Sequence, residues 1–118
     1  MIHYRSEAGS PVVEIEVKGK VTDAELKAAL AQFRADVAGG KTRVIEVIRD
    51  FEGIEPRALW TDLTQAAPLA SKVKRAAVVA DAAWIRSLAS ISQHFIQAEV
   101  RAFEPDKIEV ARAWVAGD

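Results

Sequence analysis

Short apolar runs alternate along this chain with polar turns and with amphipathic stretches. Over residues 12–18, apolar positions alternate with charged ones, which is typical of a strand that has one wet face. Turn-forming residues at 8–11 separate this segment from a second short strand at about 2–7. The pattern therefore predicts that the chain begins with a β-hairpin.

An amphipathic helix is predicted to follow the hairpin. Thr22 and Glu25 have the spacing of a capping box, in which each side chain bonds the backbone N–H of the other residue. Gly39 and Gly40 are suited to end the helix. Between these signals lies an apolar stripe at helical spacing, formed by Leu26, Leu30, Phe33 and Val37.

Three further apolar runs are predicted to be strands. They span Arg43–Ile48, Arg75–Ala80 and Ala98–Phe103. The second is almost uninterrupted and consists of small apolar residues, which indicates burial on both faces of a sheet.

Helices are predicted after each of these strands. Pro56 is placed to open one that runs to about Ala67 and is closed by Pro68. Another spans residues 82–95, and Pro105 opens the last. The inward positions of the last helix are predicted to be Ile108, Ala111 and Val115.

The order of elements is therefore β-β-α-β-α-β-α-β-α. Right-handed crossovers through the helices make the second to fifth strands parallel. We predict an α/β sandwich in which four helices cover a mixed five-stranded sheet. Its 118 residues contain no linker or repeat, so a single domain over residues 1–118 is expected.

Composition narrows the classes of function. The chain has 16 Lys and Arg against 17 Asp and Glu, a balance without the basic surface expected of a nucleic-acid-binding protein. It has no cysteine, which excludes disulfides and thiolate metal sites. Neither a signal peptide nor a membrane span is recognisable, so a cytoplasmic protein is expected.

A glycine-rich segment, Gly39-Gly40-Lys41-Thr42, superficially resembles a phosphate-binding P-loop. The P-loop motif requires another glycine five positions before its second one, and Ala35 stands there. In addition, a helix precedes the segment and a strand follows it, so no helix N-terminus faces a phosphate. We interpret these glycines as the end of a helix and expect no nucleotide cofactor.

The sequence contains only weak evidence for a metal site or for acid–base catalysis. The two histidines, His3 and His94, are far apart in sequence and not at metal-ligand spacing. Carboxylates do gather near the predicted carboxyl ends of the strands, where α/β proteins bind ligands. Such residues more often cap helix N-termini, so we predict no metal site and no enzyme activity. The carboxylates in question are Asp23, Asp50, Glu52, Asp81 and Asp106.

Glu46 is the one charged residue among the apolar positions of a predicted central strand. Burial would raise its pKa and make it a functional candidate. The alternative is that Glu46 reaches the edge of the sheet and pairs with a basic residue.

The helix at residues 82–95 carries a broad apolar stripe. Core packing explains this stripe most simply. Arg86 is, however, the only clear charge before Glu99, which is unusual for a solvated helix. Part of the surface would then be open to a partner, a second copy of the chain or a lipid. The stripe consists of Trp84, Leu88, Ile91 and Phe95.

Several segments together resemble the SpoIIAA-like proteins, which are relatives of the STAS domain of anti-sigma-factor antagonists. The resemblance covers nearly the whole chain and implies a STAS-like β/α sandwich, an outline shared with CRAL-TRIO lipid-binding domains. It implies no established enzyme activity. The segments that carry it are Gly19-Lys20-Val21-Thr22-Asp23, Asp50-Phe51-Glu52-Gly53, Leu59-Trp60-x-Asp62, Arg75–Asp81 with Trp84, Ala98–Phe103 and Ala111-x-x-Trp114.

The resemblance does not extend to a phosphorylation switch. Anti-sigma-factor antagonists carry a phosphorylatable serine, preceded by aspartate, at the start of the helix after the third strand. Here residues 51–57 contain no hydroxyl group, and the first one follows at Thr61, a turn inside the predicted helix. We therefore expect the fold without the serine switch.

Two functions are predicted. The first is a non-enzymatic interaction or regulatory module that binds a protein partner or forms a homodimer. The alternative is a protein that binds a small apolar ligand or a membrane surface, with the helix at residues 82–95 as a mobile lid. The candidate surface consists of Phe51, Trp60, Asp81, Trp84, Leu88, Ile91 and Phe95.

Overall fold

The five strands form one sheet in the order β1-β2-β3-β4-β5. The computed structural model describes residues 1–61, 65, 67–92 and 97–117, and at 59–61 and 67 it describes the backbone only. β1 is antiparallel to β2, and each later strand is parallel to the one before it. The strands are β1 (Ile2–Ser6), β2 (Val12–Val21), β3 (Arg43–Ile54), β4 (Arg75–Ala80) and β5 (Glu99–Phe103).

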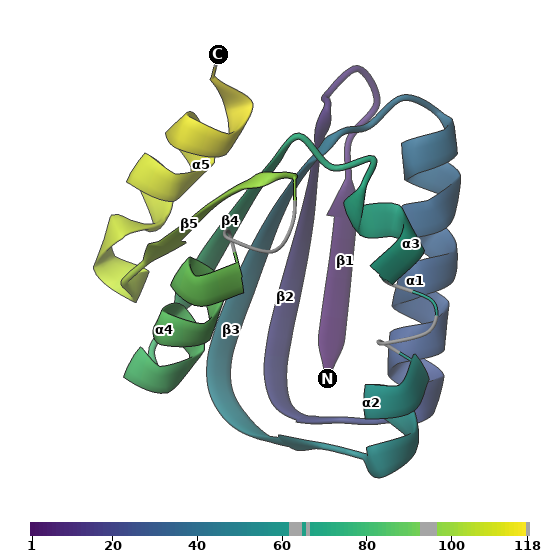
Figure 1. The fold of residues 1–118 in the computed structure, drawn as a ribbon, viewed down its shortest axis with the longest axis vertical. Coiled ribbons are helices and arrows are strands. Elements are labelled where there is room, and N and C mark those ends of the chain that lie inside the picture. The colour runs from purple at the N-terminus through teal and green to yellow at the C-terminus, as the bar shows by residue number, and fades with distance from the viewer. Residues whose placement is uncertain (62–64, 66, 93–96, 118) are drawn as a thin grey trace.

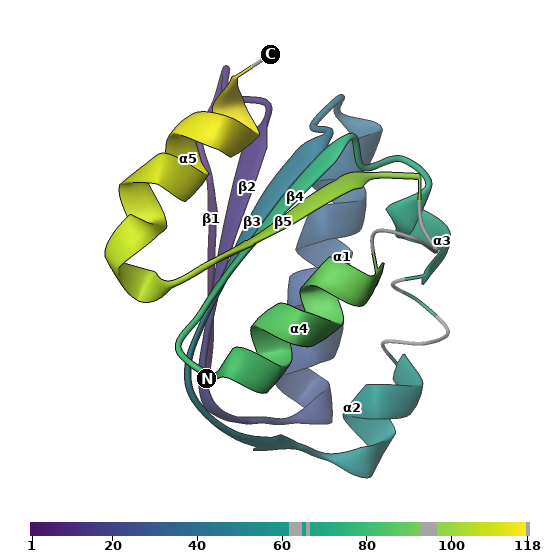
Figure 2. The same cartoon turned by 60° about the vertical axis from the view of Figure 1, so that its left-hand side comes forward.

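Helices cover both faces of the sheet unequally, as Figure 2 shows. Because β2 to β5 follow one another in a single direction, right-handed crossovers place every connecting helix on the same face. Among the helices of the described residues, only the last lies on the other face (Figures 1 and 2). The helices are α1 (Asp23–Ala38), α2 (Pro56–Thr61), α3 (Ala67–Ala70), α4 (Ala83–Ser92) and α5 (Ile108–Ala116), and a 3₁₀ turn at Pro105–Lys107 leads into α5.

The predicted mixed sheet with its N-terminal hairpin is confirmed, whereas the prediction of four helices is wrong. The single helix expected from Pro56 to Ala67 is represented by two, α2 and α3. Pro68 does not close a helix but lies in the first turn of α3. Proline is tolerated there because the first-turn N–H groups have no partner within the helix.

The predicted end of the third strand at Ile48 is also wrong, because β3 continues to Ile54. Its pairing with β2 shifts register on both sides of Gly19 and then resumes, so that Val21 pairs with Ile54. Asp50 has a positive φ of 48° and Gly53 one of 121°, which marks a bulged strand. Residues that favour turns also favour bulges, so the sequence pattern does not distinguish the end of a strand from a bulge within it.

The capping box is half confirmed. The Thr22 hydroxyl accepts a hydrogen bond from the backbone N–H of Glu25 at 3.2 Å. The Glu25 carboxylate does not return the bond but lies 3.1 Å from the amino group of Met1. Instead, Glu55 accepts from the backbone N–H of Asp23 at 2.8 Å. The residue that directly follows β3 therefore completes the cap of α1.

Two arginines of the sheet hold the C-terminal end of α5. Arg43, only 7% exposed, donates to the carbonyl oxygens of Val115, at 2.8 Å, and of Gly117. Arg75 donates to the Trp114 carbonyl at 2.7 Å. The last turn of α5 has no basic residue of its own, so β3 and β4 supply the charge that the helix dipole favours.

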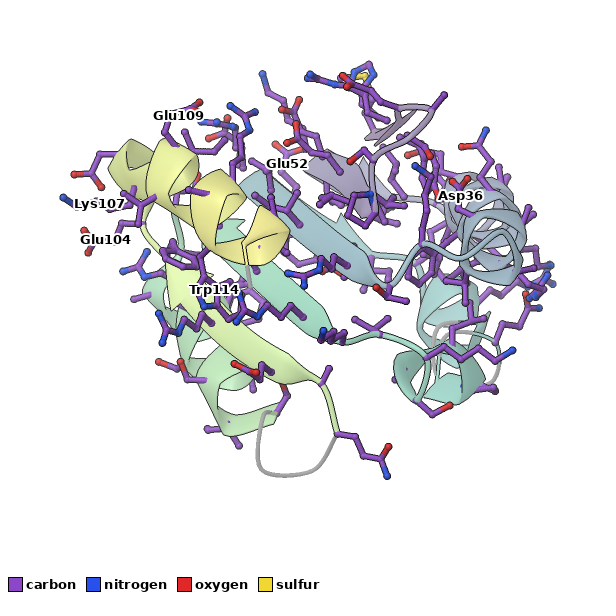
Figure 3. The ribbon with its side chains drawn as sticks, turned by 90° about the horizontal axis from the view of Figure 1, so that it is seen from above. Asp36, Glu52, Glu104, Lys107, Glu109 and Trp114 are labelled. Carbon is purple, nitrogen blue, oxygen red and sulfur yellow. The ribbon has the colours of Figure 1, made fainter. Side chains whose placement is uncertain are left out.

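The Trp114 ring lies between α5 and the sheet, as Figure 3 shows. The guanidinium groups of Arg75 and Arg101 each lie 5.1 Å from its ring centroid, within cation–π range. Beneath α5 a fully buried apolar cluster joins the helix to β3 and β4. It consists of Ile45, Val47, Ala77, Val79, Ala111 and Val115.

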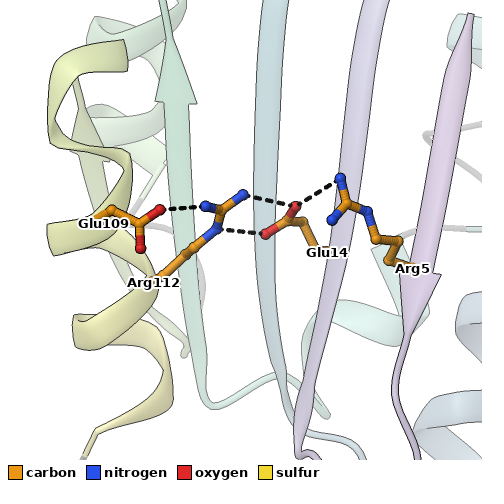
Figure 4. Close-up of polar contacts among 4 residues, drawn as sticks. All are labelled: Arg5, Glu14, Glu109 and Arg112. Atoms are coloured by element: carbon orange, nitrogen blue, oxygen red, sulfur yellow. Dashed lines mark hydrogen bonds and ion pairs between the residues drawn. The ribbon is translucent and has the colours of Figure 1, made fainter.

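An ion-pair network links α5 to the hairpin (Figure 4). Arg112 donates to both carboxylate oxygens of Glu14, at 3.0 and 3.2 Å. The side chain of Arg5 lies 3.7 Å from Glu14, and Arg112 also bonds Glu109. These contacts connect α5 to β1 and β2 across the sheet face.

On the opposite face, Tyr4 joins β1 to α1 by donating to the Asp36 carboxylate at 2.5 Å. Burial, followed by this hydrogen bond, raises the pKa of Tyr4 above its ordinary value.

We predict that Tyr4 makes folding stability fall at high pH. The unfolded chain releases the phenol proton near pH 10 or so, whereas the native protein retains it. The stability from this group is therefore complete below that pH and is lost as the pH rises toward the folded pKa. Tyr4 is the only tyrosine, so its phenolate absorbance can be titrated directly in native and urea-unfolded protein. Identical titration curves in the two states would contradict the prediction.

We also predict that Arg43→Met lowers the free energy of unfolding by about 2–4 kcal/mol, since the end of α5 loses its buried charged donor. Urea denaturation measures this. Arg49→Met is the matched control on the same face of β3, and it should cost less than about 1 kcal/mol. Equal costs for the two variants would exclude a special role for Arg43.

Candidate functional site

The outer face of α4 exposes large apolar side chains. Trp84, Leu88 and Ile91 stand at i, i+4 and i+7 and are 56%, 57% and 54% exposed. The residue that α4 buries is Ala89, and the helix contacts β4 and β5. The core-packing interpretation of this stripe is therefore wrong for these three residues. We call Trp84, Leu88 and Ile91 the α4 stripe.

Arg86 fixes α4 to the sheet. Its guanidinium donates to the carbonyl oxygens of Ala80, at 2.8 Å, and Asp81, at 3.1 Å. It also lies 3.7 Å from the Glu104 carboxylate. The one charge of α4 is thus directed to the ends of β4 and β5, which explains why the helix has no charged outer face.

Three predicted site residues do come together at the end of β4. The rings of Phe51 and Trp84 lie 6.0 Å apart at an angle of 56°. The Asp81 carboxylate accepts from the backbone N–H of Asp50 at 2.9 Å. The bulge in β3 is what brings Asp50 and Phe51 to this position. Asp81 therefore bonds a strand N–H group and does not cap a helix.

Three other predicted residues have no described side chain. Trp60 lies in α2 and only its backbone is described, and Phe95 and His94 fall outside the described residues. Asp23 pairs with Lys27 at 2.9 Å within α1. Over the described residues, no three acidic or histidine side chains are grouped so that they could hold a metal ion.

A cavity of about 430 Å³ lies between the sheet and the helices on the α1 face. Glu46 of β3 lines it, and every other described lining residue is apolar. The sequence pattern missed this cavity, because periodicity shows which residues face inward but not how far apart two layers lie. The described lining residues are Ile2, Ile15, Val17, Val21, Leu26, Ala29, Leu30, Phe33, Val44, Glu46, Ile48, Phe51, Ile54, Ala70, Val73, Ala76 and Ala98.

Comparison with known proteins identifies the family. A family model described as SpoIIAA-like matches residues 12–116. The chain belongs to the SpoIIAA-like family. No curated protein matches its sequence. None of the helices in the described ranges is both long enough and apolar enough to span a membrane.

Solved structures agree with this SpoIIAA-like assignment at the level of the fold. An uncharacterized DUF3478-family protein with a SpoIIAA-like fold, from Shewanella loihica PV-4, is similar with a TM-score of 0.73 and 18% identity, over 98% of this chain and 92% of that one. The anti-sigma factor antagonist SpoIIAA in its unphosphorylated form is similar with a TM-score of 0.63 and 9% identity, over 97% and 98%.

We predict that the α4 stripe of this SpoIIAA-like protein contributes little to folding. Leu88→Ala should change the free energy of unfolding by less than about 0.5 kcal/mol, because the side chain is exposed. The same change at Leu30, which is 7% exposed on α1, should cost about 2 kcal/mol or more. Urea denaturation of both variants tests this, and a large loss for Leu88→Ala would place that side chain in the core.

Proposed function

We propose that this protein is a non-enzymatic interaction module that binds a protein partner through the α4 stripe. The observation that carries the proposal is the exposure of Trp84, Leu88 and Ile91 by more than half on one helix face. SpoIIAA-like membership supports a regulatory or interaction role in general.

The geometry of the stripe suits a helix-in-groove complex. Anchor residues at i, i+4 and i+7 are the spacing by which an amphipathic helix enters an apolar groove. Tryptophan is also among the residues that contribute most to binding at interfaces. Arg86 is directed inward, so few charges would lose their water when the face is covered.

The neighbouring Phe51 ring extends the same surface. Its contact with Trp84 joins the bulged end of β3 to the first turn of α4. The partner surface proposed here therefore includes both elements and lies at the carboxyl end of β4.

We infer that binding is not controlled by a serine phosphorylation switch. The stretch from Phe51 to Arg57 contains no serine or threonine, and it forms the end of β3 and the start of α2. Thr61 is the last residue of α2 and not its first, so a phosphate there would not meet a helix N-terminus.

The test uses the protein as bait for affinity capture and then measures the captured partner in purified form. We expect Leu88→Asp to remain folded and to lose affinity by at least about tenfold, because a charge would be buried at the interface. Val110→Asp is the matched control, since Val110 is a large apolar residue on α5 that is 55% exposed.

The outcomes separate the explanations. If folded Leu88→Asp binds the partner as tightly as the wild type does, the proposed surface is contradicted. The proposal is also contradicted if the wild-type protein captures liposomes but no protein partner. Sedimentation of the wild type shows whether the partner is a second copy of the chain. Thr61→Glu should leave partner affinity within about twofold, and a larger loss would contradict the absence of a switch.

The cavity favours a second function, the binding of a small apolar ligand. Its volume of about 430 Å³ lies within the range of small-molecule sites, roughly 300–1,000 Å³. Its described wall is apolar apart from Glu46. Calorimetric titration of the purified protein with alkyl compounds of one chain length and different head groups tests this function, and the absence of binding by all of them would contradict it.

A further inference from the structure

Glu46 stands in the middle of the sheet, on the cavity side. It pairs in register with Ile15 of β2 and Val78 of β4, so its backbone is covered by strands on both sides. Its side chain is half-buried and lines the cavity with Val44 and Ile48 of the same face. Over the described part of the wall, a ligand in this cavity would therefore meet one carboxylate among apolar side chains.

The Glu46 carboxylate would discriminate between ligands by charge. Coulomb interactions are stronger in an apolar site than in water, so a carboxylate head group would be repelled and an ammonium group attracted. Glu46 already has an interaction within the protein. A carboxylate offers about four acceptor positions, so it can also accept hydrogen bonds from a ligand.

The described wall of the cavity is apolar apart from Glu46, and the Glu46 carboxylate can accept further hydrogen bonds. We propose that the cavity binds single-chain amphiphiles whose head group donates hydrogen bonds, and that Glu46 selects protonated amines over carboxylates. The proposal rests on the second function given above and adds the class of ligand. The alkyl chain contacts the apolar wall formed by α1 and the strands, and the amine contacts the Glu46 carboxylate.

The test compares dodecylamine, dodecanol and dodecanoate at neutral pH by calorimetric titration of the purified protein, with dodecanol below its solubility limit and the two ionic compounds below their micelle concentrations. We expect dodecylamine to bind about tenfold or more tighter than dodecanoate, with dodecanol between them. Glu46→Gln should weaken dodecylamine binding by about tenfold and reduce the difference between the amine and the carboxylate.

Two variants make the test specific. Glu16→Gln is the same chemical change on the opposite face of the neighbouring strand, beside the cavity-lining Ile15 and Val17, and should alter none of the three affinities. Ala29→Phe fills the cavity from α1 and should abolish binding of all three compounds. Circular dichroism establishes that each variant is folded.

The experiment distinguishes an error in the proposed class of ligand from an error in the second function, the binding of a small apolar ligand in the cavity. If no compound binds, both are overturned. If all three bind with equal affinity and Glu46→Gln has no effect, the cavity site stands and selection by Glu46 is overturned. Binding that survives in folded Ala29→Phe lies outside the cavity and overturns both.

Discussion

The order of the strands constrains everything else in this structure. Because β2, β3, β4 and β5 are neighbours in the order of the chain, right-handed crossovers place α1 to α4 on one face and leave the other to α5. The two faces of the sheet are therefore packed differently. Several helices of unequal length pack on one face, and a single short helix packs on the other.

On the face covered by α5, charged side chains connect the helix to the sheet. Arg43 and Arg75 supply donors to the end of α5, and Arg112 in the middle of α5 donates to Glu14 of β2. On the other face, α1 covers β1 and β2 while α4 contacts β4 and β5. The cavity lies in this layer, and α4 at its margin keeps an exposed apolar stripe. Both candidate functions therefore follow from the same arrangement of helices.

The sequence predicts the strands, the parallel direction of the second to fifth strands, and a common surface that includes Phe51, Asp81 and Trp84, because hydrophobic periodicity and crossover handedness are local or topological rules. It does not predict the extension of β3, since turn and bulge residues are alike. Periodicity finds the α4 stripe but cannot show that Ala89, a small residue, faces the sheet and leaves larger ones outside. The direction of Arg86 and the cavity depend on distances between elements that no local pattern encodes.

Methyl NMR under xenon pressure tests the central claim, that one face of the sheet carries an apolar cavity while the other is solidly packed. Xenon enters empty apolar cavities and shifts the resonances of the methyl groups around them. We predict saturable shifts for the methyl groups of Leu30, Val44 and Ile48, which line the cavity, and none for Val47 and Val115 beneath α5. Absence of shifts in the first group, or equal shifts in both groups, would contradict the account.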